Sequence, residues 1–291
     1  MSVRTLDRAP DLGALYRRAG KDVVLGFLPG GGKSGDSLPE DVLQLESVEI
    51  DRDHLADYSR VCGFQLSDGL PATYLHNVTF PLAMELMTSS AFPFPVVGMV
   101  HVENTIEQVR PVTADERPTV RLWVEDLRPH RAGQQLDVVG EAEIDGEIVW
   151  RDRSVYLRRG KTEGPRPKKS PGKGQPPAPQ PEAVWALGGD TGRQFAAVSG
   201  DSNPIHMSAL AAKAFGMPAA IAHGMYVKAR CLSQLESELS DAYTIEVSFK
   251  APVVLPTKVG FASAKHEDRL AFTVHGTRKP TQHLRGSLRP A

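Results

Sequence analysis

The chain has 291 residues, of which 41% are hydrophobic and 24% are charged, and its formal net charge is −1. This is the composition of an ordinary globular protein, with room for one large domain or two of about 100–150 residues. The near-neutral charge gives no electrostatic reason to expect a nucleic-acid partner.

The first 20 residues and the two cysteines indicate the cellular compartment of the protein. MSVRTLDRAPDLGALYRRAG has no uninterrupted apolar core of signal-peptide length, and no segment approaches the ~20 apolar residues that span a bilayer. Cys62 and Cys231 lack the spacing of a metal site, which favours reduced thiols. We therefore expect a cytoplasmic protein without a membrane span.

A glycine-rich segment, GFLPGGGKS (26–34), resembles a phosphate-binding loop that follows an apolar strand. Such a loop needs four residues between its first glycine and the Gly-Lys-Ser/Thr triplet, and here Gly26 lies one position too far away. Gly35 and Pro39 also interrupt the helix that should follow. The segment is predicted to be a surface loop rather than a nucleotide site.

Both halves of the chain place strand-like segments after helical ones. Asp145-Gly146 is a strong hairpin signal between two of these segments. Strands that follow a long helix within about 110–150 residues indicate an α+β unit, with an antiparallel sheet packed on the helix. Alternating or apolar runs occur at 100–109, 119–127, 136–144, 147–157, 243–255, 258–266 and 270–276.

Residues 160–183 differ from the rest of the chain. The sequence GKTEGPRPKKSPGKGQPPAPQPE, starting at Gly160, has no hydrophobic periodicity and predicts an extended linker. Its basic residues could attract an acidic carrier protein, but a solvated tether is the favoured interpretation. The predicted domains are therefore 1–159 and 184–291.

The two halves also resemble each other in sequence. LPATYLH (70–76) aligns with MPAAIAH (217–223), and YSRVCG aligns with FAAVSG upstream of them. The offset is 137 residues between Val61 and Val198, but it is 147 between the two motif histidines. The common order favours a duplication, with ten extra residues in the second half, between Gly200 and the second proline motif, in the segment that holds Asp201 and His206.

That extra segment predicts a capped helix beside a carboxylate. Asn203 is expected to be the N-cap and Pro204 the first helical residue, with the helix running to Gly216. His206 would lie in the first turn, where the helix dipole disfavours a charged imidazole. Asp201 lies just outside and can fold back toward this ring. The alternative is that these polar residues only form a turn and a cap.

A second helix is predicted to begin at Gly224, within AIAHGMYVKARCLSQLESEL (220–239). The backbone N–H of Gly224 would then point outward, toward a developing oxyanion. His223 could act as a ligand or an acid. Its counterpart His76 lies in the half that lacks the motif, so a structural role for His223 is favoured.

SGDSNPIHMSALAAKAFG followed by IAHGM resembles the motif of the MaoC-like, (R)-specific enoyl-thioester hydratases and dehydratases. The likeness includes Gly-Asp-x-Asn-Pro-x-His and the seventeen-residue step from His206 to His223. The two-copy layout is similar to double-hotdog members, whose N-terminal repeat has lost the catalytic segment. FPLAMELMTSSAFPFPVVGMVHV further resembles (3R)-hydroxyacyl-carrier-protein dehydratases.

This resemblance implies a fold and a set of residue roles. The expected fold class is α+β, a double hotdog whose central helices are Asn77–Ser89 and Gly224–Leu239. Pro81 would have to lie in the first turn of its helix or kink it. No metal and no redox cofactor are implied. The implied catalytic residues are Asp201, His206 and Gly224, and the implied substrate-binding residues are Asn203, His223 and Met225.

The implied activity is reversible hydration of trans-2-enoyl thioesters to (3R)-hydroxyacyl thioesters in fatty-acid metabolism, with acyl-CoA or an acyl carrier protein as the thioester carrier. A hotdog thioesterase and a non-catalytic acyl-binding protein are the alternatives. Apolar residues of 80–87 and 91–99 could line an acyl tunnel, although each is more simply a core residue. Two hotdogs in one chain are compatible with a monomer or a homodimer.

Overall fold

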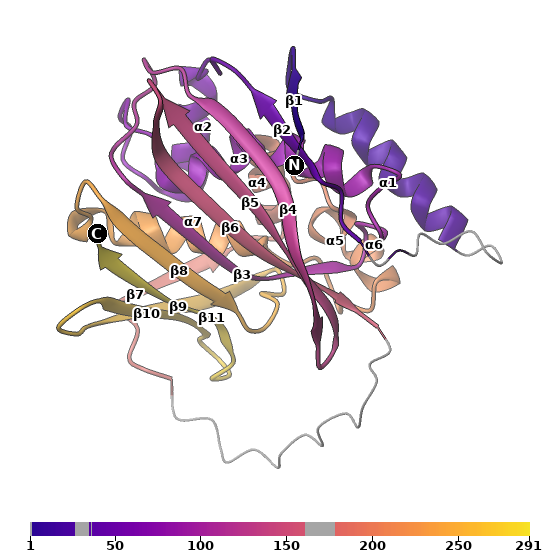
Figure 1. The fold of residues 1–291 in the computed structure, drawn as a ribbon. Coiled ribbons are helices and arrows are strands. Elements are labelled where there is room, and N and C mark those ends of the chain that lie inside the picture. Colours follow the sequence, from indigo (N-terminus) through magenta and orange to yellow (C-terminus); the bar gives the residue numbers. More distant parts are fainter. Residues whose placement is uncertain (1, 27–34, 36, 161–177) are drawn as a thin grey trace.

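The computed structural model describes residues 2–26, 35, 37–160 and 178–291 (Figure 1). Its central feature is an 11-stranded sheet with the order β1-β2-β4-β5-β6-β3-β8-β11-β10-β9-β7. All neighbouring strands pair antiparallel except β1 and β2. The strands are β1 Ser2–Leu6, β2 Asp41–Leu45, β3 Met99–Gln108, β4 Thr119–His130, β5 Gly133–Ile144, β6 Glu147–Arg159, β7 Ala183–Leu187, β8 Tyr243–Phe249, β9 Thr257–Lys265, β10 Leu270–Gly276 and β11 Gln282–Pro290.

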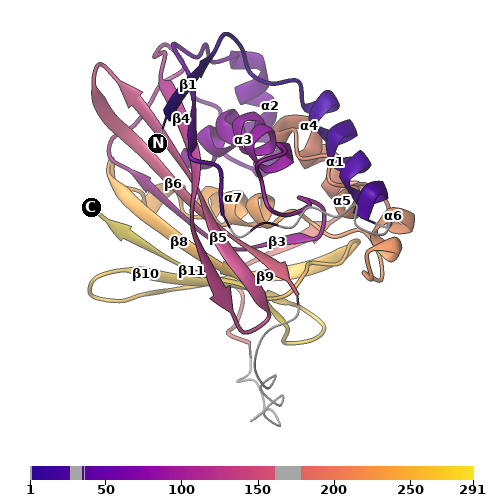
Figure 2. The ribbon, with the colours of Figure 1, turned by 45° about the vertical axis from the view of Figure 1, so that its right-hand side comes forward.

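The helices gather on one face of this curved sheet (Figure 2). One helix from each half, α3 or α7, lies inside the curve (Figure 2). Among the described residues, no helix is both long and apolar enough to cross a membrane. The helices are α1 Leu12–Gly26, α2 Arg52–Cys62, α3 Ala72–Thr88, α4 Thr191–Ser199, α5 Pro204–Met207, α6 Ala209–Ala214 and α7 Gly224–Gln234, with a 3₁₀ turn at Glu236–Glu238.

The two halves of the chain meet at the β3–β8 pair, whose register runs from Glu103↔Ser248 to Gln108↔Tyr243. The strands from β1 to β6 lie on one side of this junction, and the strands from β7 to β11 lie on the other. Each half of the chain contributes its own part of the sheet and its own central helix, α3 or α7, which confirms the predicted α+β class. The predicted hairpin turn is also confirmed, because Asp145 and Gly146 join β5 to β6 with φ of 51° and 83°.

The central helix of the first half is longer than predicted. α3 begins at Ala72 rather than Asn77, with Pro71 at its N-cap, and Pro81 lies inside the helix without ending it. An internal proline costs a helix about 3 kcal/mol. Burial of side chains such as Leu82 and Leu86 contributes about 1.5–3 kcal/mol each, so tertiary packing outweighs the proline.

The central helix of the second half is shorter than predicted. α7 starts at Gly224 as expected, but it ends at Gln234 rather than Leu239. The chain tightens there into i→i+3 bonds, from Leu235 N to Leu232 O (3.0 Å) and from Glu238 N to Leu235 O (2.8 Å).

Four strands were not predicted: β1, β2, β7 and β11. Three of them have only five residues, and β11 carries charged side chains that mask its alternation. β7 begins at Ala183, the last residue of the predicted linker, and Glu182 N already donates to Phe261 O (2.8 Å). The linker prediction therefore extends too far at this end. Residues 161–177 of the linker and residues 27–34 of the glycine-rich segment lie outside the described residues.

A buried polar network connects the halves beneath this sheet. Lys228 of α7 is 0% exposed, and its ammonium contacts Asn104 Oδ1 and donates to Ile245 O at 3.2 Å. Asn104 Nδ2 contacts Asp152, whose other carboxylate oxygen contacts His76 Nδ1. Burial lowers the pKa of Lys228 to about 7. The α7 helix is thus tied to the first half by polar contacts as well as by packing.

Candidate active site

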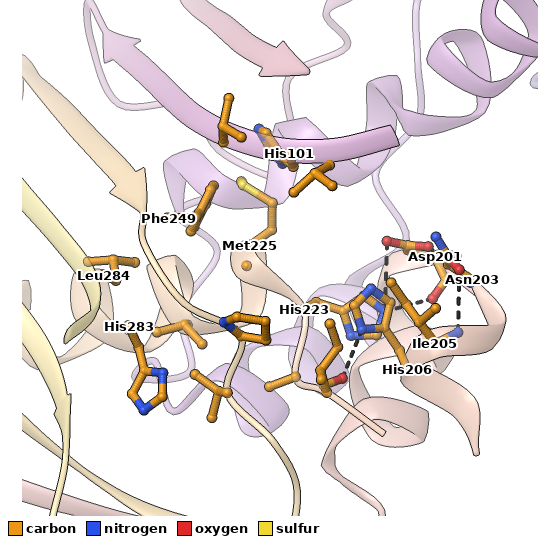
Figure 3. Close-up of a pocket in the computed structure, with 18 of the residues that line it drawn as sticks. His101, Asp201, Asn203, Ile205, His206, His223, Met225, Phe249, His283 and Leu284 are labelled. Carbon is orange, nitrogen blue, oxygen red and sulfur yellow. Dashed lines mark hydrogen bonds and ion pairs between the residues drawn. The ribbon is translucent and has the colours of Figure 1, made fainter. Parts of the chain in front are cut away.

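A cavity of about 290 Å³ lies at the junction of the two halves. The first half contributes His76, His101 and Tyr156 to its wall, among other residues. Figure 3 shows His101 on one side of the cavity, across from Asp201 and the two histidines of the second half. All six residues predicted from the sequence line this cavity: Asp201, Asn203, His206, His223, Gly224 and Met225.

The predicted helix after Asp201 is present, but it is broken. Asn203 is its N-cap, with Oδ1 accepting from Ile205 N at 3.4 Å, and Pro204 is its first residue. α5 ends after Met207, because Ser208 adopts an extended conformation and its side chain caps the separate helix α6. A helix of four residues has little macrodipole, so the predicted dipole effect on His206 does not apply.

A backbone carbonyl orients the His206 ring instead. His206 is 8% exposed, and its Nδ1 lies 2.8 Å from the carbonyl oxygen of Ile221. In the neutral ring Nδ1 must carry the proton, because a carbonyl can only accept. Nε2 therefore keeps its lone pair and can accept a proton.

The Asp201 carboxylate is held by two donors on one oxygen. Oδ1 accepts hydrogen bonds from the Tyr16 hydroxyl and from Asn203 N, both at 3.1 Å. Burial acts to raise the pKa of Asp201, but the adjacent His223 and His206 rings and these hydrogen bonds outweigh it. The pKa therefore lies below its ordinary value, and the group is ionised at neutral pH.

His223 has a structural position between the loop and α7. Its ring is buried, and Nε2 donates to the backbone carbonyl of Asp201 at 2.8 Å. The same nitrogen lies 3.8 Å from Asp201 Oδ2. Burial and the neighbouring His206 lower the pKa of His223 to about 4, so this ring is neutral at physiological pH.

Asp201, His206 and His223 each offer one polar atom within 4.8 Å of the others. Two groups at this separation can share one water molecule through hydrogen bonds of ordinary length. The three groups also have the spacing of a small cation site. Backbone carbonyls occupy His206 Nδ1 and His223 Nε2, which leaves one nitrogen of each ring for a ligand bond.

Gly224 and Met225 form the start of α7 at the same cavity. His223 is the N-cap of α7, and the first intrahelical bond runs from Val227 N to His223 O. The Gly224 amide is therefore among the first-turn donors without an intrahelical acceptor. A Cβ at Gly224 would lie 2.9 Å from the Phe249 ring, so only glycine fits here without displacing that ring.

Sequence analysis missed three polar residues in this region: Tyr16, which contacts Asp201, and His101 and Tyr156, which line the cavity. Tyr16 reaches Asp201 from the N-terminal segment, which carries no motif. His101 stacks on Tyr156 with ring centroids 4.7 Å apart, and burial lowers the pKa of His101 to about 3. The positions of His101 and Tyr156 within strands follow from the alternating sequence pattern. That the two residues line the cavity depends on how the two halves of the chain pack together.

The apolar runs considered for an acyl tunnel belong mainly to the hydrophobic core. Phe80 and Met99 are core residues that also line the cavity. Leu82, Met87 and Phe92 belong to the core and do not line the cavity. The core interpretation therefore holds for most of these residues.

The chain is similar in sequence to a known protein family and to a curated protein. Residues 171–285 match the family model of the MaoC like domain. The chain is 35% identical over 254 residues to "3-hydroxyacyl-thioester dehydratase X" of Mycobacterium tuberculosis (strain ATCC 25618 / H37Rv), covering 87% of this chain and 91% of the relative.

Solved structures give the same result. The crystal structure of Mycobacterium tuberculosis HtdX matches with a TM-score of 0.76 and 34% identity, covering 86% of this chain and 100% of the other. A MaoC-like dehydratase from Phytophthora capsici matches with a TM-score of 0.69, covering 88% and 96%. At 18% identity, the second likeness shows the fold alone.

Proposed function

This chain belongs to the family of MaoC-like 3-hydroxyacyl-thioester dehydratases, which are hydro-lyases, and we propose that it interconverts (3R)-hydroxyacyl and trans-2-enoyl thioesters. The observation that carries the proposal is the meeting of Asp201 and His206. Their polar atoms lie within 4.8 Å of each other in a cavity that also contains the Gly224 amide.

In the hydration direction, one water molecule is held between Asp201 and the lone pair of His206 Nε2. One of the two groups accepts a proton from the water as its oxygen attacks C3. The proton is then delivered to C2 from the same face, which makes the addition syn. In the reverse direction, the pair removes the C2 proton and protonates the departing hydroxyl group.

The Gly224 N–H stabilises the charge that builds on the thioester oxygen during this step. A first-turn amide is a free donor with the positive end of the helix dipole behind it. Asn203, His223 and Met225 complete the substrate-binding wall, with Asn203 and His223 holding the loop that carries Asp201.

The two halves of the chain have different roles in this proposal. Residues 184–291 form the catalytic hotdog, and residues 1–159 form a degenerate hotdog whose wall residues accommodate part of the acyl chain. We place the enzyme in the cytoplasm, in fatty-acid elongation, acting on acyl-CoA or acyl-carrier-protein thioesters as a monomer or a homodimer.

Crotonyl-CoA tests the reaction directly. Hydration removes the conjugated enoyl absorbance without releasing a thiol, whereas a thioesterase would release free CoA to a thiol reagent. Supplying (3R)- and (3S)-hydroxybutyryl-CoA separately tests the stereochemistry, since only the (3R) isomer should regain enoyl absorbance. Thiol release, or equal use of both isomers, would overturn the assignment.

A further inference from the structure

Helix α1 of the first half is docked against the part of the second half that carries Asp201. Leu15 is buried at 2% exposure, and Arg18 donates to Glu85 of α3 at 3.1 Å. Arg4 of β1 forms a second ion pair with Glu85. These contacts hold α1 in place, with Tyr16 facing the loop between α4 and α5.

The Tyr16 hydroxyl makes two hydrogen bonds to that loop. Ser202 N donates to the hydroxyl oxygen at 2.7 Å, and the hydroxyl lies 3.1 Å from Asp201 Oδ1. A backbone N–H can only donate, so the single phenolic proton is directed to the carboxylate. We propose that Tyr16 is a positioning residue for Asp201, an inference that rests on the proposed dehydratase function.

A second contact brings α1 to the same loop. Gly200 has φ of +74°, and a Cβ on it would lie 2.4 Å from Leu12 Cδ1 of α1. Leu12 therefore packs directly on the backbone of Gly200, one residue before Asp201. Leu12 contacts Gly200, and the Tyr16 hydroxyl is hydrogen-bonded to Asp201 and Ser202. Helix α1 therefore contacts three consecutive residues of the loop between α4 and α5.

These contacts give the two carboxylate oxygens of Asp201 different environments. Oδ1 is occupied by the Tyr16 hydroxyl and Asn203 N, while Oδ2 faces His223 Nε2 at 3.8 Å. Tyr16 thus holds the carboxylate in one rotamer, with Oδ2 left for water. It also helps keep Asp201 ionised, because a hydrogen bond to the charged form favours that form.

Tyr16→Phe removes only the hydroxyl group and is the direct test. We expect kcat to fall roughly 10- to 100-fold, as for loss of one hydrogen bond to a charged group, with little change in KM. The acidic limb of the pH–rate profile should move to higher pH, because the pKa of Asp201 rises. The other titratable groups that face Asp201 are His206 of α5, His223 before α7 and Tyr156 of β6.

Tyr74→Phe is the matched control. The Tyr74 hydroxyl lies 2.8 Å from His54 Nδ1, and neither residue lines the cavity. This substitution should leave both kcat and the profile unchanged. Unchanged kcat and an unchanged acidic limb in Tyr16→Phe would overturn the proposal. A wild-type protein without hydratase activity would instead contradict the proposed function, so the two failures are distinguishable.

A second variant covers the case in which Tyr16→Phe does not fold. Replacement of Tyr16 by 3-fluorotyrosine keeps the hydroxyl and its packing but makes it a stronger donor. The acidic limb should then move to lower pH, opposite to the phenylalanine variant. A limb that stays in place in this folded variant counts against the assigned role.

Discussion

The imidazole rings of His206 and His223 stack with centroids 3.7 Å apart and planes inclined by 27°. Each ring also bonds a backbone carbonyl of the other's segment: His206 bonds Ile221 and His223 bonds Asp201. The stack therefore locks the Asp201 loop, α5 and the start of α7 into one unit. Burial and the neighbouring His206 ring together lower the pKa of His223.

Replacing either member of the proposed catalytic pair should abolish most activity. In Asp201→Asn and His206→Asn we expect the rate of crotonyl-CoA hydration to fall roughly 10²–10⁴-fold, the usual contribution of general acid–base catalysis. Asp190→Asn and His266→Asn change the same residue types at exposed positions and should keep the wild-type rate. Near-wild-type rates in the first two variants, with substrate binding intact, would end the mechanism.

Gly224→Ala should slow the reaction by crowding rather than by loss of the amide. The added Cβ would meet the Phe249 ring at 2.9–3.1 Å and push either this ring or α7 out of place. A small misplacement of the oxyanion donor costs at least about tenfold in kcat. In a Phe249→Leu background the same substitution should cost less. An equal loss in both backgrounds would show that crowding is not the cause.

Stability should fall as the solution is acidified from about pH 6.5. The folded protein holds His223 with a pKa of about 4 and His101 with a pKa of about 3, against about 6.5 when unfolded. Between these values the unfolded state binds more protons, so the free energy of unfolding decreases with falling pH. His223 alone accounts for about 3 kcal/mol by pH 4.

Urea unfolding at several values between pH 5 and pH 7.5 measures this decline before most carboxylates titrate. His101→Phe keeps the stacking on Tyr156 and removes one of the groups, so it should flatten the curve. His266→Gln is the exposed control and should follow the wild type. A wild-type curve that is flat over this range would contradict the buried neutral rings.

Lys228→Met should destabilise the fold strongly. The substitution retains volume but leaves Asn104 Oδ1 and the Ile245 carbonyl without the donor that Lys228 supplies. A buried acceptor left without its donor costs about 1–3 kcal/mol. Thermal and urea unfolding measure this loss of stability. Lys213→Met, at an exposed position of α6, is the control and should change stability by less than about 0.5 kcal/mol. Equal stability of the two variants would show that the hydrogen bonds of Lys228 do not stabilise the fold.

Much of the candidate site was predictable because its signals are local. Asn203 as a cap, Pro204 as a first helical residue and the helix start at Gly224 depend on backbone preferences within a few residues. The Asp145-Gly146 turn belongs to the same class. Such features are set by steric limits on φ and ψ and by short-range hydrogen bonds, so they survive in almost any tertiary context.

The sequence by itself thus determined the motif, its caps and the α+β pattern of each half. Only the tertiary structure decided that α3 continues through Pro81, that α1 brings Tyr16 to Asp201 across 185 positions, and that both halves line one cavity. These outcomes depend on which apolar surfaces are buried together. Such burial is non-directional and scales with area, so it leaves no fixed spacing along the chain to be read.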